Sequence, residues 1–388
     1  MYRIGQEEID AVARVIESQE LFKVNDGTLQ ECQNVQLEME KIFGAKHALF
    51  MTSGHAALTS ALIARGIGPG DQVIVPAYTY IATAMAVVAA GAIPVIAEID
   101  ETMTLDANDV EKKITPYTKA ILPVHIQGFP CNMDAIMEVA KKHDLFVLED
   151  SCQADGGSYH GKRLGSVGHA GALSFNAFKL VSCGEGGALL TNDDTLYERA
   201  LIYHDSSAVA FFGDQLDNVT TQPFCGNEYR MHEIPAAIMR VQFSRMDGIL
   251  HDLRKNKKIL MDALSSDFAF APSHDLEGDC GTTLALRFDT AEEAVAFTEK
   301  VSFNTTIPIN TGKHIYKHWT PIMEKRGALH PKMDPFKMEA NRDIIPDYNA
   351  DMCPRTLDIL SRTVYIPINP DASEAEMLEK VEAIKAAK

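Results

Sequence analysis

Short apolar runs alternate with segments of helical periodicity over most of the first 200 residues. Runs of strand length lie at residues 47–51, 72–76, 93–100, 119–125, 145–150, 170–175 and 186–192. Segments between them, such as 56–66 and 132–144, carry apolar residues at helical spacing, with Asn132 as a predicted N-cap. This alternation predicts a parallel sheet with helices on both faces. Because such sheets bind ligands beyond the carboxyl ends of their strands, the residues after each strand are the candidates for function.

The two ends of the chain follow other patterns. The first 45 residues are polar and helical, with a predicted loop at Asn25–Gly27. Beyond residue 245, a smaller α+β domain is predicted by helical patterns at 252–266 and 374–388 and strand patterns at 282–290 and 363–369. We therefore expect a large domain at residues 1–245 and a small C-terminal domain at 246–388. Residues 305–350 show weak periodicity, which is typical of a binding loop.

Charge and cysteine content narrow the class of protein. The 388 residues include 36 Lys and Arg against 54 Asp and Glu, which gives a net charge of −18. So acidic a chain is a poor candidate for binding nucleic acid or an anionic membrane surface. There is no apolar run of membrane-spanning length and no signal-peptide pattern at the start. Seven cysteines without a CxxC pair indicate reduced thiols in the cytoplasm and no metal site.

Three segments carry residues suited to chemistry. Gly54 and His55 follow the first strand at the start of a helix, which is either an anion-binding turn or an ordinary strand-to-helix turn. Asp150 ends a buried strand, where a carboxylate can bind a metal, a ribose or a protonated ring nitrogen, or cap a helix. Lys179 lies in an apolar stretch, so it is either a shielded nucleophilic amine or a lysine that reaches the surface.

Taken together, these parts are the ones that a pyridoxal 5'-phosphate site requires. The cofactor's aldehyde needs a lysine amine, and its pyridine nitrogen needs a carboxylate so that the ring can act as an electron sink. Its phosphate needs backbone amides and hydroxyls, for which Ser174 is a candidate.

The order of the motifs points to a known family. The chain contains SGHAAL, VIVPAYTYIAT, GAIPVIAEID, VHIQG, VLEDSCQA, GSVG, SFNAFK and GEGGALLTND, in this order. In this it resembles the sugar aminotransferases of the DegT/DnrJ/EryC1/StrS family, which are fold type I pyridoxal phosphate enzymes. The resemblance implies an α/β fold with a large, mostly parallel seven-stranded α/β/α domain and a smaller C-terminal α+β domain. It also implies a homodimer with shared active sites.

The resemblance assigns roles to individual residues. It implies that Lys179 forms the Schiff base with the cofactor, and it places the other cofactor contacts at Gly54, His55, Tyr80, Asp150, Gln153 and Ser174. His55 stands where most relatives have Thr. Glu228 stands where relatives have an Asn that reaches the neighbouring subunit's phosphate, so we expect Asn227 to take that role.

The implied reaction is a transamination. Glutamate or glutamine would donate the amino group to a keto or aldehyde group of a sugar or cyclitol. The acceptors left open are a nucleotide-linked keto-sugar, a scyllo-inosose-type cyclitol and an 8-oxo-octulosonate of lipopolysaccharide. Candidate substrate-binding residues, which could equally be surface loop residues, are His314, Lys317, His318 and Arg326.

Other activities remain as alternatives. The family includes dehydratases, in which a His replaces the lysine, and the same fold could serve as a ligand sensor. A nicotinamide-dependent oxidoreductase is disfavoured, because SGHAAL does not fit the G-x-G-x-x-G turn.

Overall fold

The computed structural model describes residues 3–23, 27–207 and 220–388. Its centre is a seven-stranded sheet in the order β1-β9-β8-β5-β4-β2-β3. The strands are β1 (His47–Met51), β2 (Gln72–Pro76), β3 (Ile93–Ala97), β4 (Thr118–Ile121), β5 (Phe146–Asp150), β8 (Ala170–Ser174) and β9 (Gly187–Thr191). Strand β9 is antiparallel to both of its neighbours, β1 and β8, and the other strand pairs of this sheet are parallel. The predicted α/β architecture with a mostly parallel sheet is confirmed.

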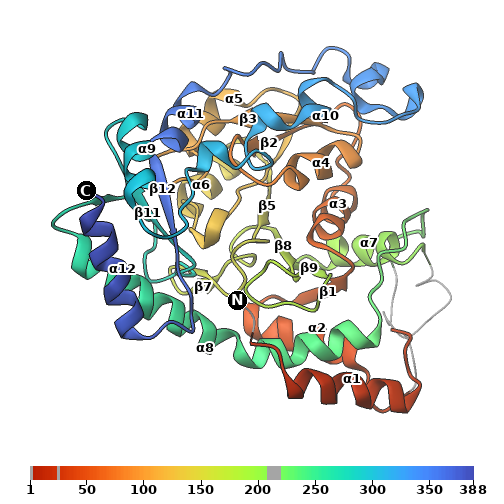
Figure 1. Cartoon of the computed structure of the whole chain (residues 1–388). Helices are drawn as coiled ribbons and strands as arrows, with labels where there is room; N and C mark the ends of the chain where they lie inside the picture. The colour runs from red at the N-terminus through yellow and green to blue at the C-terminus, as the bar shows by residue number, and fades with distance from the viewer. Residues whose placement is uncertain (1–2, 24–26, 208–219) are drawn as a thin grey trace.

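Helices cover both faces of this sheet (Figure 1). They are α3 (Gly54–Ala64), α4 (Ala82–Ala89), α5 (Ala107–Lys113), α6 (Met133–His143) and α7 (Asp194–His204). The Asn132 side chain accepts the Ala135 amide at 3.1 Å, which confirms the predicted N-cap of α6. Alternate strand residues enter two different apolar cores: Phe50 belongs to one and Leu49 to the other.

A single long helix links the two ends of the chain. Helix α8 (Glu233–Leu264) has 32 residues, which corresponds to about 48 Å at 1.5 Å per residue. It packs against α1 (Gln6–Ser18), α2 (Glu31–Phe43) and α12 (Glu374–Ala386), as Figure 1 shows. The expected domain boundary at residue 245 lies inside this helix, so the division at that point stays a prediction. Asn25 and Asp26 of the predicted loop lie outside the described residues.

The C-terminal part has its own small antiparallel sheet. It consists of β10 (Ala269–Phe270), β11 (Thr283–Arg287) and β12 (Thr363–Pro367), with α9 (Ala291–Lys300) and α11 (Pro354–Ser361) beside it. A two-stranded hairpin, β6 (Ser158–Tyr159) and β7 (Lys162–Arg163), belongs to the large domain. The strands predicted at 282–290 and 363–369 are confirmed.

The segment at 305–350 returns to the large domain, as Figure 1 shows. It contains α10 (Thr320–Met323) and short 3₁₀ turns at Pro308–Asn310, Tyr316–His318, Pro331–Met333, Pro335–Lys337 and Glu339–Asn341; a further 3₁₀ turn lies at Ile126–Gly128. Gln72 donates to the Ile344 carbonyl at 2.6 Å, and the Tyr348 hydroxyl donates to the Pro94 carbonyl at 2.6 Å. These bonds hold an aperiodic segment against the strands that border the site.

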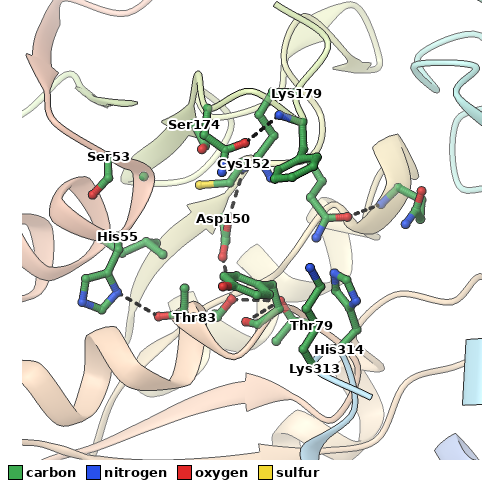
Figure 2. A pocket seen from close by; sticks show the side chains of 18 of the residues that line it. Ser53, His55, Thr79, Thr83, Asp150, Cys152, Ser174, Lys179, Lys313 and His314 are labelled. Carbon is green, nitrogen blue, oxygen red and sulfur yellow. Dashed lines mark hydrogen bonds between the residues drawn. The ribbon is translucent and has the colours of Figure 1, made fainter. Parts of the chain in front are cut away.

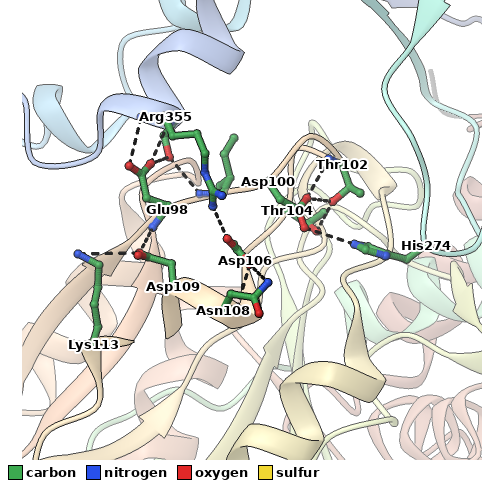
Figure 3. Close-up of polar contacts among 12 residues, drawn as sticks. Glu98, Asp100, Thr102, Thr104, Asp106, Asn108, Asp109, Lys113, His274 and Arg355 are labelled. Carbon is green, nitrogen blue, oxygen red and sulfur yellow. Dashed lines mark hydrogen bonds and ion pairs between the residues drawn. The ribbon is translucent and has the colours of Figure 1, made fainter. Parts of the chain in front are cut away.

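Buried acids attach helix α11 to the large domain (Figure 3). The Glu98 carboxylate accepts the backbone amides of Arg355 at 3.1 Å and Thr356 at 2.7 Å, and the Thr356 hydroxyl at 2.5 Å. The Arg355 guanidinium pairs with Asp106. A carboxylate at a helix N-terminus satisfies amides that have no acceptor within the helix and interacts favourably with the helix dipole. Glu98 therefore links the end of β3 to the small domain.

No helix within the three described stretches combines the length and the apolarity needed to cross a membrane.

We predict that Glu98→Gln lowers the free energy of unfolding by about 2 kcal/mol, because an amide cannot accept all the bonds that the carboxylate accepts. Urea denaturation measures this loss. Asp358→Asn is the matched control, since Asp358 lies on the same helix but is largely exposed in its pair with Arg362, and it should leave the midpoint near that of the wild type. Equal midpoints for the two variants would show that Glu98 does not hold the helix.

Candidate active site

One cavity of about 480 Å³ lies at the carboxyl ends of the central strands. Seven segments that are distant in the sequence line it, and Figure 2 shows their side chains facing a common space. Its lining includes eight of the predicted site residues, which are Gly54, His55, Tyr80, Asp150, Gln153, Ser174, Lys179 and His314.

The turn into helix α3 forms a cradle at one side of the cavity. The Ser53 hydroxyl accepts the Ala56 amide at 3.0 Å, whereas the amides of Gly54 and His55 have no acceptor among the described residues. A Cβ at Gly54 would lie 2.5 Å from Cys152 Sγ and 3.2 Å from the Leu173 carbonyl oxygen, so the turn requires glycine. Free amides at a helix N-terminus are suited to an anion such as a phosphate.

The His55 side chain is directed to a backbone carbonyl. Its Nδ1 lies 3.3 Å from the Ala82 carbonyl oxygen. Burial lowers the pKa of His55, although Ala82 and Asp150 act in the opposite direction. The ring is therefore neutral at pH 7, and Nδ1–H donates to Ala82. The cradle thus offers backbone amides rather than a charged imidazole.

The carboxylate of Asp150 is held in a fixed orientation at the end of β5. Its Oδ2 accepts the Thr83 hydroxyl at 2.7 Å, and its Oδ1 accepts the Cys152 amide at 3.1 Å. The Thr83 hydroxyl is itself 2.8 Å from that of Thr79. Figure 2 shows Asp150 between the Thr83 side of the cavity and the Lys179 side. An oriented carboxylate of this kind can bind a protonated ring nitrogen.

The preceding residue, Glu149, stabilises the fold and does not face the cavity. It is fully buried, and its carboxylate accepts the amides of Gly165, Val167 and Gly168 at 2.6–2.9 Å. His125 lies 3.0 Å from it. Because the Cys131 amide donates to His125 Nδ1, the proton that faces Glu149 is on Nε2. Consecutive strand residues face opposite sides, so Glu149 is bound within the fold while Asp150 faces the cavity.

Lys179 lies on the loop between β8 and β9. Its backbone amide donates to the Asn176 carbonyl at 3.0 Å, and its side chain lines the cavity with that of Ser174. The lysine is half-buried rather than fully shielded, since the loop around it is open and Phe178 is 81% exposed. Its amine is therefore accessible from the cavity.

The small domain supports the side of the cavity that holds Gln153. The Gln153 side chain accepts the Gln127 amide at 3.2 Å. Gln127 has a positive φ of 54°, and the Thr282 hydroxyl donates to its carbonyl at 2.6 Å. Thr282 comes from the C-terminal part of the chain, so the two sheets meet at this point of the cavity.

The aperiodic segment brings Lys313 and His314 to the cavity, where both rest against Tyr80. The Lys313 amine is 5.5 Å from the centre of the Tyr80 ring, and the His314 ring is 5.7 Å from it. Burial, together with the positive charges of Lys313 and Lys179, lowers the pKa of His314 to about 4. His314 is thus a neutral hydrogen-bonding group at pH 7.

Four predicted residues lie outside the cavity lining. Lys317, His318 and Arg326 follow His314 along the chain but do not line the cavity, and Arg326 pairs with Glu324 at 2.7 Å. Asn227 is exposed and donates to the Tyr203 hydroxyl at 2.6 Å. Glu228 is paired with Arg230 at 2.8 Å. Their expected roles stay predictions.

The residues of the cavity fit pyridoxal phosphate. Gly54 leaves the space that a Cβ would fill, the adjacent amides and Ser174 suit a phosphate, Asp150 suits a ring nitrogen, and Lys179 supplies a primary amine. Nothing in this donor set calls for a metal, and no group of three or more His, Cys, Asp or Glu side chains suited to one occurs in the described part of the chain.

Comparison with known proteins agrees with this chemistry. Residues 2–318 match the DegT/DnrJ/EryC1/StrS aminotransferase family. The spore coat polysaccharide biosynthesis protein SpsC of Bacillus subtilis is 32% identical over 98% of this chain and 94% of its own length. A GDP-perosamine synthase of Caulobacter vibrioides is 44% identical, but the match spans 54% of this chain and 57% of that protein.

Solved structures show the same fold over the full chain. The crystal structure of 3-amino-5-hydroxybenzoic acid synthase has a TM-score of 0.80 at 26% identity, covering 100% of this chain and 97% of that one. An aminotransferase from Psychrobacter cryohalolentis has a TM-score of 0.79 at 28% identity, with 98% and 96% covered. The chain therefore belongs to the DegT/DnrJ/EryC1/StrS family of pyridoxal-phosphate-dependent aminotransferases.

Proposed function

We propose that this protein transfers the amino group of glutamate or glutamine to the keto or aldehyde carbon of a nucleotide-linked sugar. The observation that carries the proposal is one cavity in which the Lys179 amine, the oriented Asp150 carboxylate and the Gly54 cradle lie together. We also propose that it acts in the cytoplasm, where a reducing environment keeps thiols such as its seven cysteines unpaired.

Each residue has a distinct task in this reaction. Pyridoxal phosphate, when bound, supplies a carbonyl for the amine and a ring that withdraws electrons. The amides of Gly54 and His55 would bind the phosphate together with the Ser174 hydroxyl, and Asp150 would keep the ring nitrogen protonated. Lys179 would hold the cofactor through its amine, and once released its Nζ would be the base that takes the proton from the substrate carbon bearing the nitrogen. Thr83 keeps Asp150 in place.

The nucleotide-linked sugar is favoured among the three acceptor classes by two observations. Lys313 brings a cation to the cavity, where it can attract a diphosphate, and neutral His314 can bond sugar hydroxyls. The Caulobacter relative is named for a GDP-linked product. Preferential transfer to a cyclitol or to an octulosonate would contradict the choice of a nucleotide-linked sugar.

A homodimer with shared sites is part of the proposal. Asn227 is exposed and outside its own chain's cavity, as expected for a residue that serves a partner subunit's phosphate. Glu228 is neutralised by its pair with Arg230, so it is not available as a phosphate ligand. These contacts favour Asn227 over Glu228 for the shared role.

We predict that Lys179→Ala removes the covalent link to pyridoxal phosphate and abolishes transamination, because no other amine can replace it at that point. Borohydride reduction followed by peptide mass spectrometry locates the link. Lys313→Ala is the matched control: it removes another amine of the same cavity but should leave the cofactor attached at residue 179. A cofactor still attached in Lys179→Ala would rule out the assigned role.

We predict that nitrogen-15 from the α-amino group of glutamate or glutamine appears in the product when a nucleotide-linked keto-sugar is the acceptor. Mass spectrometry of reactions with each donor and each of the three acceptor classes measures the transfer. Transfer at least tenfold faster to a cyclitol or an octulosonate would replace the proposed substrate while leaving the transaminase itself in place.

We predict that Asn227→Ala weakens cofactor binding about 10-fold, which corresponds to the loss of one charge-assisted hydrogen bond. Glu228→Gln is the control and should change binding little. Mixed dimers of Lys179→Ala and Asn227→Ala chains should be more active than either variant alone, since one of the two sites regains both residues. Without such a gain, the sites are not shared through Asn227.

A further inference from the structure

The side-chain amide of Gln153 is bound by the protein at its oxygen and faces the cavity with its nitrogen. The oxygen accepts the backbone amide of Gln127 at 3.2 Å. Because a backbone N–H can only donate, the bonded atom has to be the oxygen, which fixes the orientation of the Gln153 amide. Its NH₂ group has no acceptor within the described stretches, although Gln153 lines the cavity. Gln153 therefore presents hydrogen-bond donors to a molecule bound there.

The residue that holds Gln153 has a backbone conformation that needs support. Gln127 is the middle residue of the 3₁₀ turn at Ile126–Gly128, with a φ of 54° and a ψ of 19°. A residue with a side chain rarely adopts this left-handed conformation, because its Cβ comes too close to the following carbonyl oxygen. Contacts from outside the turn are therefore needed to keep the Gln127 amide directed to Gln153.

The small domain supplies these contacts. The Thr282 hydroxyl donates to the Gln127 carbonyl at 2.6 Å, and the Thr283 hydroxyl donates to the side-chain oxygen of Gln127 at 3.2 Å. The Cys280 amide donates to the carbonyl of Gly128 at 3.1 Å. All three donors lie at or just before the start of β11. One loop of the small domain thus holds the turn by its backbone and by its side chain.

That loop is itself attached to helix α8 by a buried ion pair. Lys257 Nζ lies 2.7 Å from Asp279 Oδ2, and the two side chains are 8% and 2% exposed. The other carboxylate oxygen of Asp279 accepts the Gly281 amide at 2.6 Å. The Arg254 guanidinium donates to the Asp279 carbonyl at 2.7 Å. Charge-assisted bonds of this kind are strong, so contacts outside the cavity lining fix the position of Thr282.

We propose that Thr282 and Gln127 are positioning residues, through which the small domain directs the NH₂ group of Gln153 to the ring hydroxyl oxygen of the bound cofactor. This role rests on the proposed function, in which the Gly54 cradle binds the phosphate and Asp150 binds the ring nitrogen. The ring hydroxyl is then the oxygen of pyridoxal phosphate that still needs a donor, and it accepts most strongly when it is ionised. The role involves hydrogen bonds alone, and no covalent bond changes.

The test compares pyridoxal phosphate with its 3-deoxy analogue, which lacks the ring hydroxyl. Equilibrium dialysis of the full-length protein, freed of cofactor, gives a dissociation constant for each ligand. Thr282→Val keeps the shape of the side chain and removes its hydroxyl. In this variant we expect pyridoxal phosphate to bind about fivefold more weakly, while the analogue binds within about twofold of its wild-type constant. Thr282→Ser keeps a hydroxyl and is the matched control, with both constants near the wild-type values.

A second substitution shows whether Thr282 acts through Gln153. Gln153→Leu removes the amide and should weaken the binding of pyridoxal phosphate about tenfold. Adding Thr282→Val to it should cause little further loss, since the hydroxyl then has no amide to position. Losses that multiply in the double variant would overturn the proposal. Equal weakening of the two ligands in Thr282→Val, or unchanged binding of both, would also overturn it.

Hydrogen exchange of the cofactor-free protein tests the same bonds without any ligand. The peptide that contains residues 125–131 should exchange about threefold faster in Thr282→Val than in the wild type, because the turn loses its bond from the small domain. An unchanged exchange rate would contradict the positioning role. None of these measurements uses an amino donor or an acceptor sugar, so their outcome is distinct from a failure of the amino-transfer test.

Discussion

The fixed carboxylate of Asp150 is the constraint around which the site is arranged. An unattached aspartate would rotate and lose its proton partner, but Thr83 and the Cys152 amide hold both oxygens. The backbone of Asp150 is fixed as well, because strand β5, which ends at this residue, lies between β4 and β8 in the sheet. The alternation of the strand then decides which acid serves the site, since it turns Glu149 away to bind His125 and three amides.

The other parts of the site depend on how the sheet orders the chain. Parallel strands bring the segments that follow them to one edge, so the cradle after β1, the threonines after β2 and the lysine loop after β8 meet near Asp150. The small domain completes the cavity through Thr282 and the segment that carries Lys313 and His314. Glu98 and the long helix α8 keep the two parts together, so the geometry of the cavity depends on contacts far from it.

The site residues that the sequence could predict are those that follow the end of a recognisable strand. Gly54, Asp150 and Lys179 follow apolar runs that are easy to recognise, and the order of motifs supplied their roles. Thr83 could not be recognised from the sequence, because it is a single polar residue in the first turn of the apolar helix α4 and bonds Thr79, which precedes that helix. The sequence gives no sign that Lys313 lines the cavity while Lys317, His318 and Arg326 lie outside its lining, because the segment at 305–350 is shaped by bonds to distant strands rather than by its own periodicity.

Three carboxyls within seven residues show how environment, rather than residue type, assigns function. Glu149 is saturated by hydrogen bonds and serves the fold. Asp150 is held by two donors and faces the cavity. Asp155 is buried, and this burial raises its pKa well above the ordinary value. The net charge of the whole chain does not predict this division, because the role of each carboxyl depends on a few neighbouring groups at close range.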